Sequence, residues 1–557
     1  MITAIFLAVL VTSENPHTVD FGPDATAGYA AFSVRSVNGP ATGAVVRVAY
    51  ANHPDRMTER GDFWHETRAD YLGKDILLPI APSSTDRFEL YPVKGPGEVR
   101  SRVQQGLVRY ARISVDTPGA RVEIDNFRLE NRFTYSEEPV VGSFSCSDTR
   151  LTALWNASVR TCQLSAIPQR GNETLCAYLS DGAKRDRLVW SGDLWWADIN
   201  MYAAYASDSP YMPGSLRMLA LAQTPEGYVQ ACPFPEAKTS PAAGDYGPFA
   251  SDEFAAWFVP VLRNYALYTG DLELTRKLYP AMVRLVDYLG RHTKDGLFIQ
   301  RRETCKNAGA LRFGASSLHH RSYMQILLWK TLSDAADVAI WLKEAEFAAR
   351  CRSEASKIAY VTRRRFRDKD GASFVFSLED RAYSADANAL ALAVGFVSDA
   401  DAAVIAPRIP RNWHGKFQAL AARGRFAYGY GELALRSLEE HGFFTVVDPE
   451  WKGCRTTYEC MDVKMPGWGD EAHPDTAVAG ILTAYVLGVR PVSPGYETFV
   501  FDPSPPASVS SAKGVVPTPR GLITAEWHRE NGRIVRMLAA PEGTREVEPG
   551  AGCGHKL

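Results

Sequence analysis

Residues 271–292, DLELTRKLYPAMVRLVDYLGRH, decide which kind of fold this chain adopts. Their large apolar side chains recur every three or four positions, at Leu274, Leu278, Met282, Leu285 and Leu289. Side chains with that spacing share one face of an α-helix. Asp271 precedes the pattern and is well placed to cap the first turn. The stretch therefore predicts a long helix that buries one stripe against its neighbours.

The same helical spacing continues on both sides of this stretch, from about residue 146 to residue 490. It is clear in SDAADVAIWLKEAEFAARCRSEASKIA (333–359), DANALALAVGF (386–396) and DTAVAGILTAYVLGVRP (475–491). The last of these has Gly488 near its end and Pro491 shortly beyond, which is typical of a helix stop. Roughly ten or more helices of ordinary length, joined by long irregular loops, indicate a toroid of helical hairpins.

Short strands are expected before and after the helical region. AAFSVRSV (30–37), AVVRVAY (44–50), RFELYPV (87–93) and YARISVD (110–116) alternate apolar and polar residues, as strands with one buried face do. GLITAEWHRENGRIVRMLAA (521–540) is typical of a hairpin that turns at Asn531-Gly532. We therefore predict an N-terminal β-sandwich over residues 1–145, a helical domain over 146–490 and a small C-terminal β-domain over 491–557.

The composition excludes several classes of function. Lys and Arg number 62 and Asp and Glu 64, so the formal net charge of −2 leaves no basic excess for nucleic acid or an anionic membrane. The nine cysteines show no CxxC pair and no zinc-ligand spacing with histidine, which favours free thiols in a reducing compartment over a metal site. No apolar run approaches the ~20 residues of a membrane span.

The N-terminus, MITAIFLAVLVTSENPH (1–17), allows two interpretations. A signal peptide would begin with basic residues and end at a small-residue cleavage site. The first Lys or Arg of the chain is Arg35, and no such cleavage site follows the apolar run. A buried β-strand is therefore favoured, and we expect a cytoplasmic protein rather than a periplasmic or secreted one.

Residues 180–196, SDGAKRDRLVWSGDLWW, combine acids, bases and indoles. The acids are Asp181, Asp186 and Asp193, and the indoles are Trp190, Trp195 and Trp196. Indole walls have a low dielectric constant and raise the pKa of a nearby carboxyl, as a general acid requires. Three acids also offer more acceptors than the neighbouring cations need. A surface network of salt bridges is the alternative interpretation of the same residues.

A second acidic segment, GCRTTYECMDVKMPGWGDEAHPD (453–475), precedes the last helix of the predicted toroid. Because the two acidic segments stand at the start and the end of a closed ring of helices, they can face each other across its mouth. Two carboxyl groups on either side of a sugar ring are what glycoside hydrolysis requires.

The run DGAKRDRLVWSGD resembles the signature of bacterial α-L-rhamnosidases of glycoside hydrolase family 78. The resemblance extends over most of the chain. It takes in ARVEIDNFRLENRF (120–133), TGD (269–271), SADANALALAVG (384–395), TTYE (456–459) and YVLGVRPVSPGYETFVFDP (485–503). It implies an (α/α)6 barrel flanked by β-domains, and hydrolysis with inversion at the anomeric carbon.

The resemblance also implies roles for individual residues. Asp186 falls at the position of the general acid, and Glu459 at that of the base that activates water. Asp181 and Asp193 fall on acids that hold the rhamnose hydroxyls, with the aromatic Trp190 beside them. The chain departs from many members of the family, which have Glu where it has Asp186. Aspartate is one methylene shorter, so its loop must lie closer to the glycosidic oxygen.

Five further residues are candidates for the site, and most of them have both a functional and a structural interpretation. His473 either bonds a rhamnose hydroxyl, as the family implies, or is a structural histidine. Trp257 either lines the pocket or belongs to the core. Arg185 is expected to orient a carboxylate or a sugar hydroxyl with its fixed fork of donors. Asp252 and Glu253 are helix caps or ligand-holding groups.

We therefore predict an inverting exo-α-L-rhamnosidase whose partner is a rhamnose-containing glycoside or oligosaccharide and which needs no metal and no cofactor. A second reading keeps the toroid but acts on another sugar, as a uronate lyase or an unsaturated-glucuronyl hydrolase. A lyase would use a Tyr or His base with an Arg or Asn, and the pairing of acids at 186 and 459 argues against it. A non-catalytic carbohydrate-binding relic is the third reading. The oligomeric state stays open, with a homodimer as one option.

Overall fold

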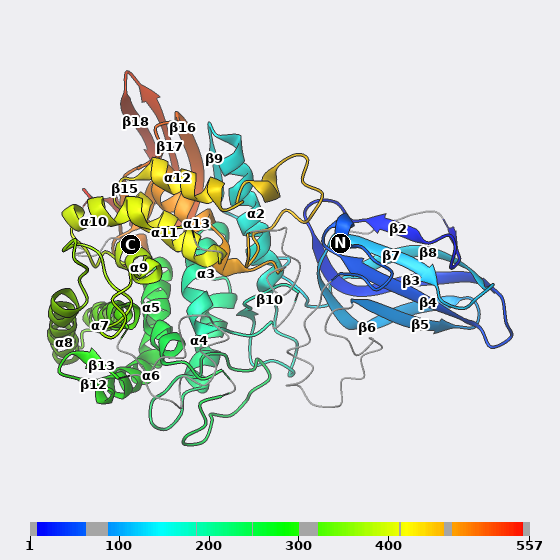
Figure 1. Cartoon of the computed structure of the whole chain (residues 1–557), viewed down its shortest axis with the longest axis horizontal. Helices are drawn as coiled ribbons and strands as arrows, with labels where there is room; N and C mark the ends of the chain where they lie inside the picture. Colours follow the sequence, from blue (N-terminus) through cyan, green and yellow to red (C-terminus); the bar gives the residue numbers. More distant parts are fainter. Residues whose placement is uncertain are drawn as a thin grey trace.

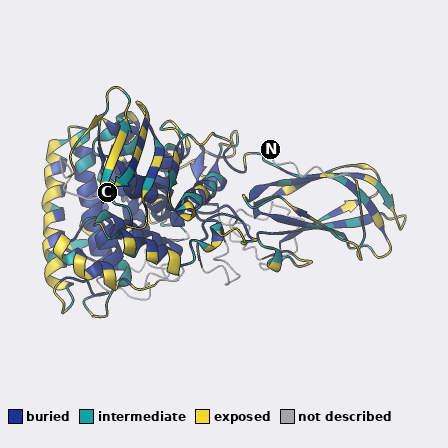
Figure 2. Ribbon diagram, turned by 90° about the horizontal axis from the view of Figure 1, so that it is seen from above, coloured by how far each residue is buried: buried dark blue, intermediate teal, exposed yellow. Residues whose placement is uncertain are grey.

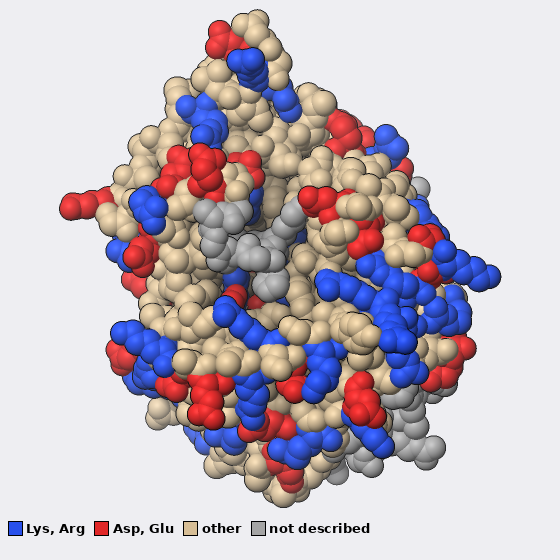
Figure 3. Space-filling view, turned by 90° about the vertical axis from the view of Figure 1, so that its left-hand side faces the viewer, with Lys and Arg blue, Asp and Glu red and all other residues tan. Residues whose placement is uncertain are grey.

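The computed structural model describes residues 8–62, 87–184, 187–247, 249–299, 321–411, 414–461 and 471–549. Figure 1 shows a helical body with a body of N-terminal strands beside it and C-terminal strands on another side of the helices. Within the described ranges, no helix is both long and apolar enough to cross a membrane. Acidic and basic side chains are intermixed over most of the face in Figure 3, as the small net charge leads one to expect.

The N-terminal strands form two antiparallel sheets. The first has the order β1 (Val9–Val11), β8 (Arg121–Glu130), β3 (Thr26–Asn38) and β6 (Gly97–Val108). The second has the order β2 (His17–Asp20), β7 (Tyr110–Val115), β4 (Ala44–Ala51) and β5 (Phe88–Val93). Phe32, Val48, Ile113 and Phe127 are fully buried and belong to one core cluster that the sheets share. The strands expected at 30–37, 44–50, 87–93 and 110–116 are confirmed.

The helix expected at 271–292 is confirmed as α6 (Leu272–Arg291). Asp271 is its N-cap and accepts a hydrogen bond from the Leu274 N–H at 2.9 Å. The five predicted stripe residues are all buried. The other helices are α2 (Thr149–Ser165), α3 (Ser191–Ala204), α4 (Tyr211–Leu221), α5 (Asp252–Thr269), α7 (Ser322–Trp341), α8 (Ala345–Arg365), α9 (Ala385–Ala393), α10 (Asp399–Ile405), α11 (Gly415–Ala427), α12 (Gly431–Glu440) and α13 (Ala479–Ile481).

Two segments are less regular than the sequence pattern predicts. Residues 333–359 form parts of two helices, because the backbone turns between α7 and α8, where Lys343 has a positive φ of 67°. The segment 475–491 contains a 3-10 turn (Pro474–Thr476), the short α13 and a π-helical stretch (Leu482–Leu487). That stretch ends at Gly488, whose φ of 98° is the left-handed conformation typical of a helix end.

The helices are arranged in two layers. Helices α3, α5, α7, α9 and α11 contact one another in that order, and the segment from Pro474 through α13 contacts both α11 and α3. The even-numbered helices α2 to α12 each contact an odd-numbered neighbour in sequence. Helices α5 and α7 are buried nearly all round, whereas α6 and α8 bury one side, so the former are interior and the latter cover them. Figure 2 shows the exposed residues on the outside of this body.

The C-terminal strands form two small sheets, and one strand of the larger sheet comes from the segment before α2. The larger sheet has the order β18 (Arg533–Ala539), β17 (Gly521–Glu530), β16 (Ser511–Thr518) and β9 (Ser143–Cys146). The hairpin turn expected at Asn531-Gly532 is confirmed, and both residues have positive φ. The remaining pairings are β14 (Val489–Pro491) with β15 (Thr498–Phe501) and β19 (Arg545–Glu546), β10 (Ala166–Ile167) with β11 (Tyr178–Leu179), and β12 (Thr293–Lys294) with β13 (Leu297–Phe298).

Candidate active site

The two acidic segments predicted from the sequence lie side by side. Tyr458 and Ala472 form an antiparallel bridge, and the Glu459 N–H donates to the Glu471 carbonyl oxygen at 2.9 Å. The Ala183 N–H donates to the Ala472 carbonyl oxygen at 3.1 Å. The Lys184 N–H donates to Glu471 Oε1 at 2.6 Å. Residues separated by nearly the whole helical region therefore share one site.

Asp181 is buried and ties the ends of its own loop together. Its Oδ1 accepts a hydrogen bond from the Leu188 N–H at 2.9 Å, and its own N–H donates to the Leu188 carbonyl oxygen at 2.9 Å. Arg185 and Asp186, the predicted orienting cation and general acid, belong to this loop but lie outside the described residues. The closed loop fixes the chain on both sides of these two positions.

Asp193 lies on the first turn of α3 and is buried. Burial disfavours its charge and raises the pKa of its carboxyl to about 6, although the nearby Lys416 ammonium opposes that rise. Lys416 Nζ lies 3.3 Å from Asp193 Oδ1 and 3.5 Å from Asp475 Oδ2. One ammonium therefore neutralises parts of two buried carboxylates.

His473 forms a tight pair with Asp475, whose Oδ1 lies 2.6 Å from His473 Nδ1. Burial opposes protonation of the imidazole, but the carboxylate of Asp475 outweighs it and raises the pKa of His473 to about 10. His473 and Lys416 in turn hold the pKa of Asp475 below its usual value, against the effect of burial. The cluster thus contains two carboxylates, Asp193 and Asp475, and two cations.

Asp193, His473 and Asp475 offer ligand atoms within 4.8 Å of one another, a spacing that suits a metal ion. The Lys416 ammonium, however, lies within 3.5 Å of both carboxylates. A buried divalent cation next to that ammonium would be strongly repelled. The arrangement is therefore one of paired charges, in which Lys416 and the protonated His473 supply the positive charge.

Glu459 is buried, with 7% of its surface exposed, and contacts a histidine that the sequence analysis did not single out. His414 Nε2 lies 3.4 Å from Glu459 Oε1. His414 and Lys416 stand in WHGKFQAL at the start of α11, where neither motif spacing nor acidic composition marks them. A histidine and a lysine two positions apart were the only signal in the sequence, and their burial becomes visible only in the structure.

Aromatic rings form one side of the site. Trp190 contacts Phe249 and Phe254, with ring centroids 5.0 and 5.5 Å apart. Lys416 Nζ lies 5.6 Å from the centre of the Trp196 ring. Trp257 is fully buried and stacks on Trp195 at 4.4 Å, the position of a core residue one layer behind these rings.

The N-terminal turns of several interior helices converge on this end of the helical body. Ser251, and not one of the two acids after it, caps α5. Asp252 accepts a hydrogen bond from the Tyr288 hydroxyl at 2.8 Å, and Glu253 Oε2 lies 3.2 Å from Arg321 at the start of α7. Because helix N-termini carry partial positive charge, their convergence favours carboxylates here.

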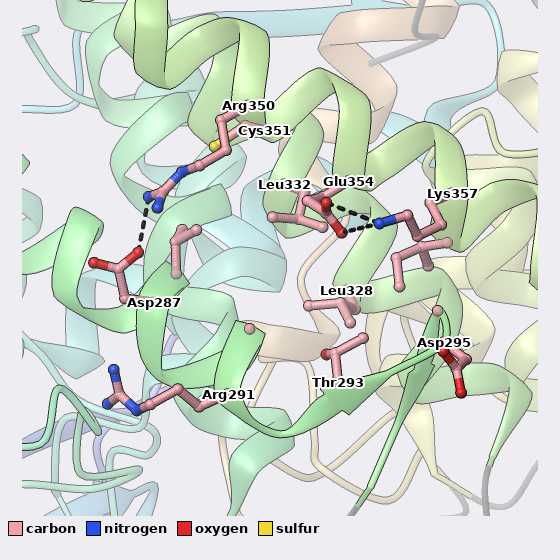
Figure 4. A pocket seen from close by; sticks show the side chains of 14 residues that line it. Asp287, Arg291, Thr293, Asp295, Leu328, Leu332, Arg350, Cys351, Glu354 and Lys357 are labelled. Atoms are coloured by element: carbon pink, nitrogen blue, oxygen red, sulfur yellow. Dashed lines mark hydrogen bonds and ion pairs between the residues drawn. The ribbon is translucent and has the colours of Figure 1, made fainter.

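One cavity away from this cluster holds none of the predicted site residues. It has a volume of about 710 Å³ and lies between α6, α7, α8 and the β12–β13 hairpin. Figure 4 shows two ion pairs among the charged side chains that line it, Arg350 with Asp287 at 2.8 Å and Lys357 with Glu354 at 3.1 Å. None of its lining residues belongs to the acidic site, so this cavity is a separate feature.

The N-terminal sheets brace both acidic segments. Asp62 is buried, with Arg87 Nη1 at 3.3 Å from its Oδ1 and Lys184 Nζ at 3.3 Å from its Oδ2. Arg109 donates to the Gly453 carbonyl oxygen at 2.7 Å. A β-carbon at Gly106 would lie 1.6 Å from the Ala183 carbonyl oxygen, so only glycine allows this approach of strand β6 to the Asp181 loop.

Asp62→Ala is expected to lower the free energy of unfolding by about 3–5 kcal/mol, because it leaves two buried cations without their carboxylate. Urea denaturation followed by circular dichroism measures the loss. Asp116→Ala is the matched control, since it breaks an ion pair with Arg47 in which both side chains are partly exposed and should cost about 1 kcal/mol or less. Equal losses in the two variants would contradict the bracing role of Asp62.

Comparison with known proteins places the chain among rhamnosidases. The family model of the bacterial α-L-rhamnosidase six-hairpin glycosidase domain matches residues 139–414, and that of the bacterial α-L-rhamnosidase C-terminal domain matches residues 488–547. A curated α-L-rhamnosidase of Streptomyces avermitilis is 25% identical over an alignment of 404 residues, and the match covers 68% of this chain and 36% of the relative. The chain thus spans about a third of that relative's length.

Solved structures agree on the fold. The family 78 rhamnosidase of Bacillus sp. GL1 has a TM-score of 0.71 at 17% identity. That match covers 99% of this chain and 55% of the Bacillus chain. The rhamnosidase of Klebsiella oxytoca with rhamnose bound has a TM-score of 0.64 at 18% identity. That match covers 85% of this chain and 88% of the Klebsiella chain. At these sequence identities the structural similarity establishes the fold alone, which is a helical domain with attached sheet domains.

Proposed function

Because the chain belongs to the bacterial α-L-rhamnosidases of glycoside hydrolase family 78, we propose that it is an inverting exo-α-L-rhamnosidase. Its substrate would be a terminal α-L-rhamnosyl residue of a glycoside or an oligosaccharide. The observation that supports the proposal is the meeting of the two acidic segments, in which Ala183 and Lys184 bond to the strand-like pair that holds Glu459.

The proposed reaction is a single displacement. Asp186 gives its proton to the glycosidic oxygen, and the bond from that oxygen to the anomeric carbon breaks. Glu459 takes a proton from a water molecule, whose oxygen attacks the anomeric carbon from the opposite face. The carboxyl groups of an inverting enzyme stand roughly 6.5–9.5 Å apart to admit that water.

The other predicted residues are assigned to sugar binding. Asp193 and Asp181 would accept hydrogen bonds from rhamnose hydroxyls, and Trp190 would face the sugar ring. His473, protonated by its pairing with Asp475, would donate to a hydroxyl. Arg185 would orient a neighbouring carboxylate or hydroxyl. Trp257 would support the aromatic wall from behind.

The proposed architecture has three parts. The helical region, residues 146–490, would be an (α/α)6 barrel, which the ring of contacts among the interior helices and their pairing with covering helices support. Residues 1–145 would be a β-sandwich that braces the site, and residues 491–557 a C-terminal β-domain. A cytoplasmic location remains part of the proposal.

Hydrolysis of p-nitrophenyl α-L-rhamnopyranoside, followed by proton NMR in the first minutes, tests the proposal. We expect release of p-nitrophenolate, with β-L-rhamnose appearing first and mutarotating afterwards. Aryl α-L-arabinopyranoside, β-D-galactoside and β-D-glucuronide are the comparison substrates and should react far more slowly.

Two outcomes would contradict parts of the proposal. Initial α-L-rhamnose would mean retention, with a covalent intermediate and carboxyl groups only about 5 Å apart. Binding of L-rhamnose in calorimetry without hydrolysis of any aryl glycoside would favour a non-catalytic carbohydrate-binding protein.

A further inference from the structure

The start of α11 touches the site through three consecutive residues, His414, Gly415 and Lys416. His414 is the N-cap, and its Nδ1 accepts a hydrogen bond from the Lys416 N–H at 3.4 Å. An imidazole nitrogen that accepts an amide proton carries none itself, so the ring proton is on Nε2. Nε2 lies 3.4 Å from Glu459 Oε1. A neutral His414 therefore donates to the carboxylate of Glu459.

The surroundings keep His414 neutral. Burial lowers its pKa, and the Lys416 ammonium lowers it further, against the opposing effect of Glu459. A neutral donor holds one oxygen of Glu459 without taking up the proton that the carboxylate must receive from water. The carboxylate therefore keeps its negative charge, which the proposed reaction requires of a base.

Gly415 brings the helix close enough for this contact. Its N–H donates to the Glu459 carbonyl oxygen at 2.9 Å. A β-carbon at this position would lie 2.7 Å from Thr476 Cγ2 and 3.1 Å from the Glu459 carbonyl oxygen. Any larger residue would push α11 away from Glu459.

Lys416 lies on the same turn and contacts Asp193, one of the residues assigned to sugar binding. It is buried, its Nζ lies 3.3 Å from Asp193 Oδ1 and 3.5 Å from Asp475 Oδ2, and it stands over the Phe254 ring at 5.7 Å. Because burial alone favours protonation of Asp193, a fixed ammonium at this distance keeps that acid an acceptor for sugar hydroxyls.

We propose that the turn 414–416 is a positioning element for the proposed reaction, in which His414 orients Glu459 and Lys416 orients Asp193. The inference rests on the proposed function. Among the residues that the structure describes, the titratable groups that face Glu459 are His414 and Lys416 from α11, Asp193 from α3 and His473 from the downstream segment. Of these, His414 makes the direct contact with its carboxylate.

Two substitutions of His414 separate positioning from helix capping. Asparagine places its amide near the Nδ1 position, so His414→Asn keeps a good N-cap and loses the reach to Glu459. Glutamine is longer and places an N–H donor near the Nε2 position, so His414→Gln keeps the bond and loses the cap. We expect His414→Asn to lower kcat by about 10²-fold, with KM little changed and the acidic limb of the pH–kcat profile displaced. His414→Gln should retain most of the activity.

The control is His441→Asn. His441 is another buried histidine, it lies at the end of α12, and its Nδ1 contacts the Ser437 carbonyl oxygen. This variant should leave kcat and the pH profile unchanged. A higher kcat in His414→Asn than in His414→Gln, or an unmoved pH profile in His414→Asn, would reduce His414 to a helix cap and overturn the inference.

Lys416 is tested by the split between KM and kcat. Lys416→Met should raise KM for the aryl rhamnoside by about 10- to 100-fold, since it loses a charge-assisted bond to Asp193. Lys330→Met is its control, because Lys330 is also buried and pairs with Asp334 at 2.6 Å on α7. A KM unchanged in Lys416→Met, or raised equally in both variants, would remove the positioning role of Lys416.

NMR of the full chain labelled with [15N]histidine makes the test independent of turnover. At pH 7 His414 should be neutral with its proton on Nε2, because its pKa lies below the ordinary histidine value, and Glu459→Gln should shift its signals but not those of His441. A charged His414, or a proton on Nδ1, would overturn the inference even in an active enzyme. Absence of hydrolysis with the expected signals would instead refute the proposed function and leave the pairing of His414 with Glu459 established.

Discussion

In Glu459→Gln, kcat for aryl α-L-rhamnosides should fall by about 10²–10⁴-fold, as loss of a general base does. The amide has the same shape as the carboxylate and keeps an oxygen that can accept from His414 Nε2. The fold and the binding of rhamnose should therefore survive, because only the ability to take a proton from water is lost. Steady-state kinetics, with calorimetric titration of L-rhamnose, measures both quantities.

Asp271→Asn is a matched control for this acid-to-amide change. Asp271 caps α6 and accepts from the Tyr265 hydroxyl at 2.6 Å, and asparagine caps helices about as well as aspartate. Its kcat should equal that of the unmodified chain. Azide added to Glu459→Gln should restore turnover with a β-configured glycosyl azide as product. Near-normal turnover in Glu459→Gln would remove this residue from the reaction.

Local patterns in the sequence predicted the elements that depend on local interactions. Helix α6 follows from its apolar period and from Asp271, and the hairpin follows from Asn531-Gly532. The break between α7 and α8 could not be predicted, because Lys343 adopts a positive φ that its residue type does not favour. Strand β9 was also missed as a member of the C-terminal sheet, since its partner β16 lies more than 350 residues away in sequence.

The residues of the candidate site also fall into those that local sequence predicted and those that depend on the tertiary fold. The acidic segments at 180–196 and 453–475 were found from composition and from the family resemblance. His414 and Lys416 were not, because their roles arise only when the fold brings the start of α11 to the segments of Glu459 and Asp193. Lys416 and Asp193 are 223 residues apart. The bracing of Lys184 by Asp62 likewise depends on how the N-terminal sheets dock, which no local pattern encodes.

Asp186→Asn should divide substrates by their leaving groups. The leaving group of an alkyl α-L-rhamnoside would be a strongly basic alkoxide and needs the acid's proton. The kcat for such a substrate should therefore fall by about 10²–10⁴-fold. p-Nitrophenolate departs with far less help, and its rate should change much less. The alkaline limb of the pH–rate profile, which reports loss of the acid's proton, should flatten. Rates for a series of aryl and alkyl rhamnosides over pH 4–9 measure all three effects.

The two neighbouring aspartates provide the contrast for that prediction. Asp193→Asn and Asp181→Asn should raise KM and lower kcat together whatever the leaving group, because their bonds to the sugar persist into the transition state. The Asp181 loop should stay closed, since asparagine still accepts from the Leu188 N–H. An alkaline limb that survives in Asp186→Asn, with an unchanged dependence on the leaving group, would place the acid elsewhere. Glu253 would be the next candidate, because burial raises the pKa of its carboxyl on the first turn of α5, against the opposing charge of Arg321.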